Sequence, residues 1–100
     1  MSTFTLSANS HVAFSYAVPQ NGRIRFDVES ERPTATLVVD SKGLAEFKAG
    51  RYKEMHSYGG SAGLTHHVQE LHLPFRGPWY LLIVNWDPKQ VTAVHYNVWS

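Results

Sequence analysis

The chain carries six histidines among 100 residues, and these side chains have the widest chemical range in the sequence. Alternate residues of a strand point to the same side, so His66, Glu70 and His72 would share one face of an extended segment. Imidazole nitrogens and a carboxylate oxygen suit zinc, with His56 or His95 as a further ligand from a neighbouring strand. The HExxH helix and other spaced zinc motifs are missing. We therefore expect no metal and no cofactor, and keep His66, Glu70 and His72 as the best metal candidates.

Two further patterns suggest catalysis, but neither is complete. Ser57, Ser61, His66 and His67 are residue types of a hydrolase, yet no nucleophile elbow or orienting acid accompanies them. The segment YGGSAG, residues 58–63, is rich in glycine like a phosphate-binding loop, but it lacks the Gly-Lys-Ser/Thr ending and a following helix. A flexible hairpin connection explains it better. The sequence thus predicts a protein that is not an enzyme.

The composition is typical of one ordinary domain spanning residues 1–100, with 43% hydrophobic and 17% charged residues. A net charge of +1 with no basic cluster argues against a nucleic-acid partner. The lack of cysteine excludes disulfides and thiolate metal sites, and it fits a reducing compartment. The first ten residues show no secretory signal, and no apolar run approaches the ~20 residues of a membrane span. We expect a cytoplasmic protein without a membrane partner.

Alternation of apolar and polar residues dominates the chain and predicts short β-strands. Residues 11–18 and 23–29 alternate on either side of the turn signal PQNG, which predicts an antiparallel hairpin between them. Further strands are expected at 34–40, 52–58, 65–74, 79–86 and 91–99, with one helical turn at 44–48. The pattern predicts an all-β, two-layer antiparallel β-sandwich, jelly-roll-like or Ig-like, of seven to eight short strands. Its predicted core is Phe14, Ile24, Phe26, Val28, Leu37, Leu81, Ile83 and Val94.

The segment WYLLIVNW, residues 79–86, differs from the other strands because it is apolar on both faces. One face of a sandwich strand lies in the core, so the other needs a loop, large neighbouring side chains or another molecule to cover it. Trp86 stands at the end of this strand, where a sandwich meets solvent. We expect a binding surface between the YGGSAG segment and the NWDPKQ turn that combines aromatic, titratable and approachable backbone groups. Its predicted residues are His56, Tyr58, Gly59, Gly60 and Trp86.

Residues 44–99 contain a set of short motifs at Phe47, Gly50, Tyr58, Gly59, Gly60, Pro74, Gly77, Trp79 and Val98. With these positions the chain resembles a small bacterial family of β-sandwich domains of unknown function. Members of that family occur alone or beside TIR domains of bacterial signalling and defence proteins, so the resemblance implies a recognition or oligomerisation module. The chain departs from the family at Tyr80 and Leu81, where a His-Val pair is expected, and at NWDPKQ, which replaces a glycine-rich turn.

These features favour a non-catalytic recognition or interaction module that binds a protein partner or a small ligand. Self-association as a homo-oligomer is a further option. The alternative is a carbohydrate-binding domain, which requires Trp86, Trp99 or Tyr58 to be exposed in one coplanar strip. A small histidine-metal enzyme is the third reading, and it rests on the incomplete ligand set described above.

Overall fold

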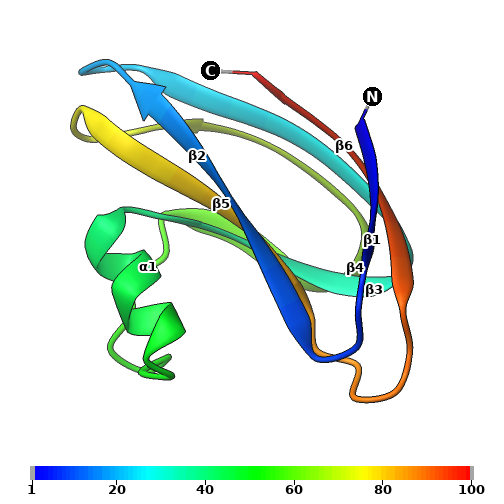
Figure 1. Ribbon diagram of the computed structural model, residues 1–100. Coiled ribbons are helices and arrows are strands. Elements are labelled where there is room, and N and C mark those ends of the chain that lie inside the picture. Colours follow the sequence, from blue (N-terminus) through cyan, green and yellow to red (C-terminus); the bar gives the residue numbers. More distant parts are fainter. Residues whose placement is uncertain (1, 100) are drawn as a thin grey trace.

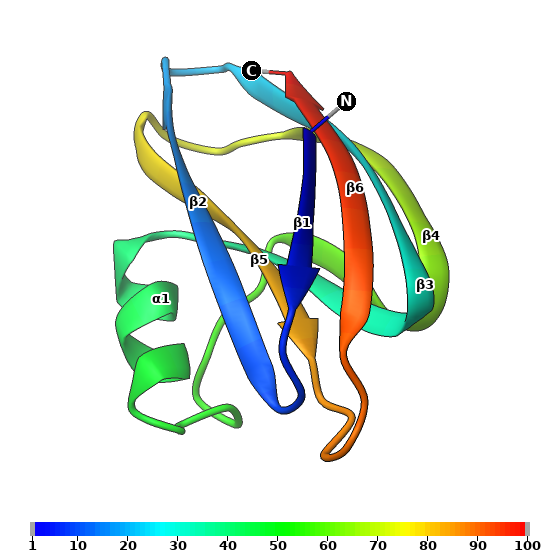
Figure 2. The same ribbon diagram turned by 45° about the vertical axis from the view of Figure 1, so that its right-hand side comes forward.

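Six antiparallel strands and one short helix make up residues 2–99, the part of the chain that the computed structural model describes (Figure 1). The elements are β1 (Ser2–Leu6), β2 (Ser10–Val18), β3 (Arg23–Val39), α1 (Ser41–Lys48), β4 (Gly59–His72), β5 (Gly77–Asn85) and β6 (Thr92–Trp99). The expected β-rich fold is confirmed, but within these residues the strands number six rather than seven to eight. They form one continuous sheet that curls like half of a barrel (Figure 2).

The strand order is β1-β6-β3-β5-β2, with β4 paired to β3 outside this path. The first half of β3 pairs with β6, and its second half pairs with β5. The two halves of the sheet therefore face each other across the core. Phe14 of β2 stacks on Tyr96 of β6 at a ring-centroid distance of 4.6 Å, and Phe4 of β1 packs edge-on against both rings.

A sharp bend in the middle of β3 makes this arrangement possible. The sequence predicts separate strands at 23–29 and 34–40, but the structure has one strand of 17 residues with an irregular register between Glu29 and Thr34. Pro33 lies in this irregular segment, where a residue without an N–H group is tolerated. The turn residues that indicated a strand end thus mark a bend inside one strand.

The predicted hairpin between residues 11–18 and 23–29 is wrong. β2 pairs with β5 instead, with Phe14 opposite Leu81. The PQNG turn does form, with Asn21 at φ 59° and a hydrogen bond from Gly22 N to Pro19 O, but it connects the two facing halves of the sheet. Alternation shows that a strand has one buried face; it does not identify the neighbouring strand.

The predicted core is largely correct. Six of its eight residues are fully buried: Ile24, Phe26, Val28, Leu81, Ile83 and Val94. Phe14 is partly buried and packs against this core. Leu37 is also partly buried, but it packs against a second apolar cluster rather than this core.

The helix α1 covers the second face of β5. Asp40 caps this helix by accepting a hydrogen bond from Gly43 N at 2.8 Å, so the helical turn expected at 44–48 is confirmed as part of a longer helix. Phe47 of the helix packs with Leu82 and Val84 in a second apolar cluster on the convex side of the sheet. The chain therefore covers this face itself at Leu82 and Val84, which are both buried.

Two other expectations fail in the segment after the helix. Residues 52–58 contain no strand. The glycine-rich YGGSAG segment is not a flexible hairpin connection, because β4 begins at Gly59 and pairs with the second half of β3. Gly59 lies opposite Val38 and Gly60 opposite Leu37, so both belong to the sheet.

Candidate functional site

The structure divides the five predicted site residues into two groups. Tyr58 packs edge-on against Trp79 at 4.7 Å and against Phe75 at 6.0 Å, and His56 lies over its ring at 4.3 Å. Burial, followed by the charge of the Asp40 carboxylate and a hydrogen bond to it, raises the pKa of the Tyr58 phenol. The Tyr58 ring is therefore partly buried and covers the end of the core.

The backbone of Gly59 and Gly60 is closely approached, as expected, but the approaching groups belong to the same chain. A Cβ atom on Gly60 would lie 2.0 Å from the carbonyl oxygen of Thr36, and Gly60 N donates a hydrogen bond to Gln69 Oε1 at 2.8 Å. A Cβ atom on Gly59 would meet the side chain of Leu71. Both glycines thus allow tight packing of β4 on its own neighbours.

Trp86 lies in the second group, at the opposite end of β5. Trp86 lies seven positions after Trp79 in the sequence, which corresponds to about 23 Å along a strand. Trp86 is 52% exposed and lines a cavity of about 140 Å³. The other residues around this cavity, here called the Trp86 pocket, are Asn9, Ser10, His11, Phe47, Lys48, Tyr52 and Val84.

The aromatic walls of the Trp86 pocket are fixed by contacts between rings. Phe47 packs edge-on against His11 at 4.8 Å and contacts Tyr52 at 5.4 Å. Phe47 is buried, whereas Tyr52 is 54% exposed beside it. The helix that covers the second face of β5 therefore also builds one wall of the pocket.

The turn that carries Trp86 is held by hydrogen bonds of the buried Asn85 and the partly exposed Asp87, a role that the sequence does not identify. The amide nitrogen of Asn85 donates hydrogen bonds to the carbonyl oxygens of Leu6, Ser7 and Gln90. Asp87 then accepts hydrogen bonds from the backbone of the two residues that end the turn, Lys89 and Gln90. These backbone hydrogen bonds, more than the nearby Arg32 guanidinium, lower the pKa of the Asp87 carboxyl. The only sequence sign of this arrangement was one asparagine inside an apolar strand.

A second polar group lies at the bend of β3 and centres on His67, which is 1% exposed. Its Nε2 atom lies 3.0 Å from the carbonyl oxygen of Leu64 and 3.1 Å from Thr34 Oγ1, and its Nδ1 atom lies 2.6 Å from Ser61 Oγ. A carbonyl only accepts, so Nε2 carries the proton and the Ser61 hydroxyl donates to Nδ1. Thr34 in turn lies 3.1 Å from the hydroxyl of Ser30, which donates to a backbone carbonyl.

The Ser61–His67 pair, with 2.6 Å between Ser61 Oγ and His67 Nδ1, has the distance of a nucleophile and its base. Among residues 2–99, the hydrogen-bond partners of the His67 ring are hydroxyl groups and one carbonyl. Each of these groups belongs to β3 or β4 near the irregular register. The network therefore joins β3 to β4 at the bend, with both nitrogens of the buried His67 ring hydrogen-bonded.

Because His67 is buried in its neutral form, the stability of the fold should depend on pH. Desolvation lowers the pKa of His67 below its ordinary value of 6.5, against the raising effect of its hydrogen bonds to Leu64 and Thr34; the nearby His66 lowers it further. The unfolded chain then binds a proton before the folded chain does. The contribution of the neutral His67 ring to the stability of the fold is therefore fully present above pH 6.5. It is lost as the pH falls from 6.5 toward the lowered pKa of the folded chain.

We expect the free energy of unfolding to fall by up to ~1.4 kcal/mol per pH unit in this range. Urea unfolding at several values from about pH 7.5 to about pH 5 measures it. Asp87 titrates in a lower window, because its pKa is lowered from 3.8. The His67→Gln variant should lose this slope, and His72→Gln, which removes an exposed histidine of the same strand, should keep it. An unchanged slope in His67→Gln would show that another group is responsible.

The three predicted metal candidates do not come together. Glu70 forms an ion pair with Arg23 at 3.0 Å, and His72 lies two residues further along the strand. His66 instead lies 2.8 Å from Asp27 Oδ1 and 3.6 Å from Glu29 Oε1. One strand cannot bring His66 and His72 to the same ion, because six residues span about 20 Å.

The exposed tryptophans are also separated. Trp99 is 48% exposed, and its ring lies 5.0 Å under the guanidinium of Arg25 at the end of β6. Trp86 belongs to the turn that precedes β6, so the length of that strand separates the two rings. Trp86, Trp99 and Tyr58 therefore do not form one coplanar strip.

Comparison of the chain with protein-family models and with curated proteins found no match. Within residues 2–99, no helix combines the length and the apolar character needed to cross a membrane. The resemblance described above, with its bacterial context, stays a prediction.

Proposed function

We propose that the protein is a non-catalytic recognition module whose Trp86 pocket binds an acidic segment of a partner protein. The observation that carries this proposal is that Trp86 is half exposed while the turn beneath it is held rigidly by Asn85 and Asp87. An exposed aromatic ring in a fixed position loses little conformational entropy on binding, which is why such rings dominate binding energy at protein interfaces.

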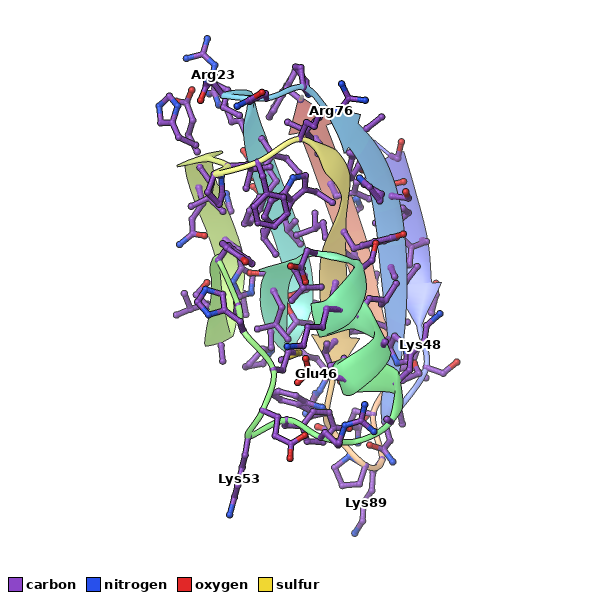
Figure 3. All side chains as sticks on the ribbon, turned by 90° about the vertical axis from the view of Figure 1, so that its left-hand side faces the viewer. Arg23, Glu46, Lys48, Lys53, Arg76 and Lys89 are labelled. Carbon is purple, nitrogen blue, oxygen red and sulfur yellow. The ribbon has the colours of Figure 1, made fainter. Side chains whose placement is uncertain are left out.

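The charges around the Trp86 pocket support an acidic partner. Lys48 lines the pocket itself, and Lys53 and Lys89 lie at the same end of the molecule (Figure 3). Of the nearby carboxylates, Glu54 is paired with Arg51 at 3.3 Å, Asp87 is paired with Arg32 at 3.5 Å, and Glu46 is buried. The lysines therefore give this end a basic character that an acidic segment would complement.

The size and shape of the Trp86 pocket suit one apolar side chain of such a segment. A cavity of about 140 Å³ is smaller than the sites that enclose whole small-molecule ligands. An apolar side chain of the segment would insert between Trp86 and Tyr52, and the carboxylates of the segment on either side of it would face the lysines. A carbohydrate chain is less well supported, because Trp86 and Trp99 lie at opposite ends of β6.

The expected sandwich fold, bacterial role and cytoplasmic location belong to the same proposal. The contacts of Phe4 and Phe14 with Tyr96 support treating the curled sheet as a variant of the two-layer sandwich, with β1 and β6 facing β2. A role in bacterial signalling or defence, and a cytoplasmic location, are parts of the proposal that rest on the resemblance and the composition.

Binding of defined peptides tests the proposal. A fluorescent peptide with a central leucine flanked by aspartates and glutamates should bind, and the same peptide with lysines in place of the acidic residues should not. Trp86→Ala should weaken binding at least about 30-fold, as expected for the loss of a 2 kcal/mol anchor. Trp99→Ala removes an equally exposed ring and should leave the affinity within about twofold.

Circular dichroism of each variant controls for folding, and Tyr52→Ala gives a second change to the same pocket. The proposal fails if the acidic peptide does not bind, or if the folded Trp86→Ala variant binds as well as the Trp99→Ala variant does. Equal binding of the acidic and basic peptides would also contradict it.

A further inference from the structure

A group of three metal-binding side chains lies on the convex face of the sheet, away from the Trp86 pocket. Asp27 and Glu29 are alternate residues of β3, and His66 lies directly opposite Glu29 on β4. One ligand atom from each of the three residues can be chosen so that all three atoms lie within 4.8 Å of one another. Phe26 and Val28, the residues before Asp27 and Glu29 on β3, are fully buried, so the alternation of the strand directs the two carboxylates outward.

We propose that Asp27, Glu29 and His66 form a binding site for one zinc ion. Zinc takes nitrogen and carboxylate oxygen ligands at about 2.0–2.2 Å in a tetrahedral arrangement, which places its donor atoms about 3.3 Å apart. The observed separations of 2.8 Å, from His66 Nε2 to Asp27 Oδ1, and 3.6 Å, to Glu29 Oε1, lie on either side of this value. An ion can therefore replace the imidazole proton with small side-chain movements.

The surroundings leave room for the ion and for a fourth ligand. The exposed fractions of the His66 and Glu29 side chains are 52% and 53%, so the ion can enter from solvent and keep a water molecule. No lysine or arginine forms an ion pair with Asp27 or Glu29 among residues 2–99. By contrast, the carboxylate of Glu70, on the exposed face of β4, is paired with Arg23.

The ligand types of the site explain why zinc fits better than magnesium or calcium. A histidine nitrogen is a good ligand for zinc and a poor one for the two hard cations, which prefer oxygen atoms.

His95 lies opposite Glu29 on β6, and its Nδ1 atom lies 2.9 Å from Thr3 Oγ1. It is outside the group of three and stands beside Glu29 as a neighbour of the site.

Calorimetric titration with zinc chloride tests the inference on the intact chain. We expect one zinc ion per chain, with affinity reduced at least about tenfold in both His66→Gln and Asp27→Asn. The matched control is His72→Gln, which removes an exposed histidine from the same face of β4 and should bind zinc like the unchanged protein. Magnesium at the same concentration should neither bind nor compete.

Histidine-ring NMR of the unchanged protein gives a second readout that does not depend on the folding of a variant. Zinc should shift the His66 ring signals and leave those of His72 in place. The inference is overturned if no zinc binds, if both ligand variants bind as well as the unchanged protein, or if the His72 ring responds instead of His66. Effective competition by magnesium would also contradict it, because it would indicate simple attraction to the carboxylates.

Discussion

The Trp79→Ala variant should lose about 3–5 kcal/mol of unfolding free energy, which is the usual effect of removing a large buried aromatic side chain. Trp79 is 0% exposed and is the largest fully buried side chain of the core. It contacts the rings of Tyr58 and Phe75, and its Nε1–H donates a hydrogen bond to the Phe75 carbonyl at 3.0 Å. The unfolding free energy of a small domain is only about 5–15 kcal/mol in total, so the variant would lose a large part of its stability.

Urea unfolding measures this loss, and Trp79→Phe separates its two causes. The phenylalanine variant keeps most of the apolar contact area but cannot donate the hydrogen bond, so it should lose less than the alanine variant. Trp99→Ala, which removes a half-exposed ring, should change stability by less than about 1 kcal/mol. A Trp79→Ala protein with the unfolding midpoint of the unchanged protein would contradict the packing described for this end of the core.

The Gly60→Ala variant is expected to be destabilised by about 2–6 kcal/mol, through backbone strain and overpacking together. Gly60 has a φ of 125°, a conformation that residues with a Cβ atom rarely adopt. The added methyl group would meet the Thr36 carbonyl oxygen at 2.0 Å and the Leu37 Cα atom at 2.9 Å. All of these are backbone atoms of β3, so they move only if the pairing of β3 with β4 is disturbed.

Gly63→Ala is the matched control because it separates the clash from the backbone conformation. Gly63 has a φ of 74°, and nothing lies within 4 Å of its added Cβ atom. It should lose only the ~1–2 kcal/mol of a left-handed conformation. Equal losses of unfolding free energy in the two variants would show that β4 does not pack against Thr36 as described.

The sequence predicted the buried faces well because burial follows from alternation within one strand. Ile24, Phe26 and Val28 point inward as expected. The strand partners were not predictable in the same way, since the pattern of β2 is equally compatible with a neighbour at 23–29 or at 77–85. A proline and polar residues normally end a strand, so the sequence predicts two strands where the structure has one bent strand.

The candidate sites show the same division between local and long-range information. The exposure of Trp86 could be anticipated from its position after an apolar strand, and the structure has it half exposed. The contribution of α1 to the Trp86 pocket could not be anticipated, because the helix lies over β5 only since β3, which precedes it, pairs with β5, and alternation does not predict strand partners. The Asp27, Glu29 and His66 group depends on the register between β3 and β4, which the two expected separate strands did not provide.

The indole N–H signals of the three tryptophans give the most direct test of the proposed recognition site. Each signal reports one location: Trp79 in the core, Trp99 beside Arg25, and Trp86 at the pocket. We predict that titration of ¹⁵N-labelled protein with the acidic leucine peptide moves the Trp86 signal progressively, while the Trp79 and Trp99 signals stay in place. A Trp86 signal that does not move at saturating peptide, or a response confined to Trp99, would contradict the assignment of this pocket as the binding site.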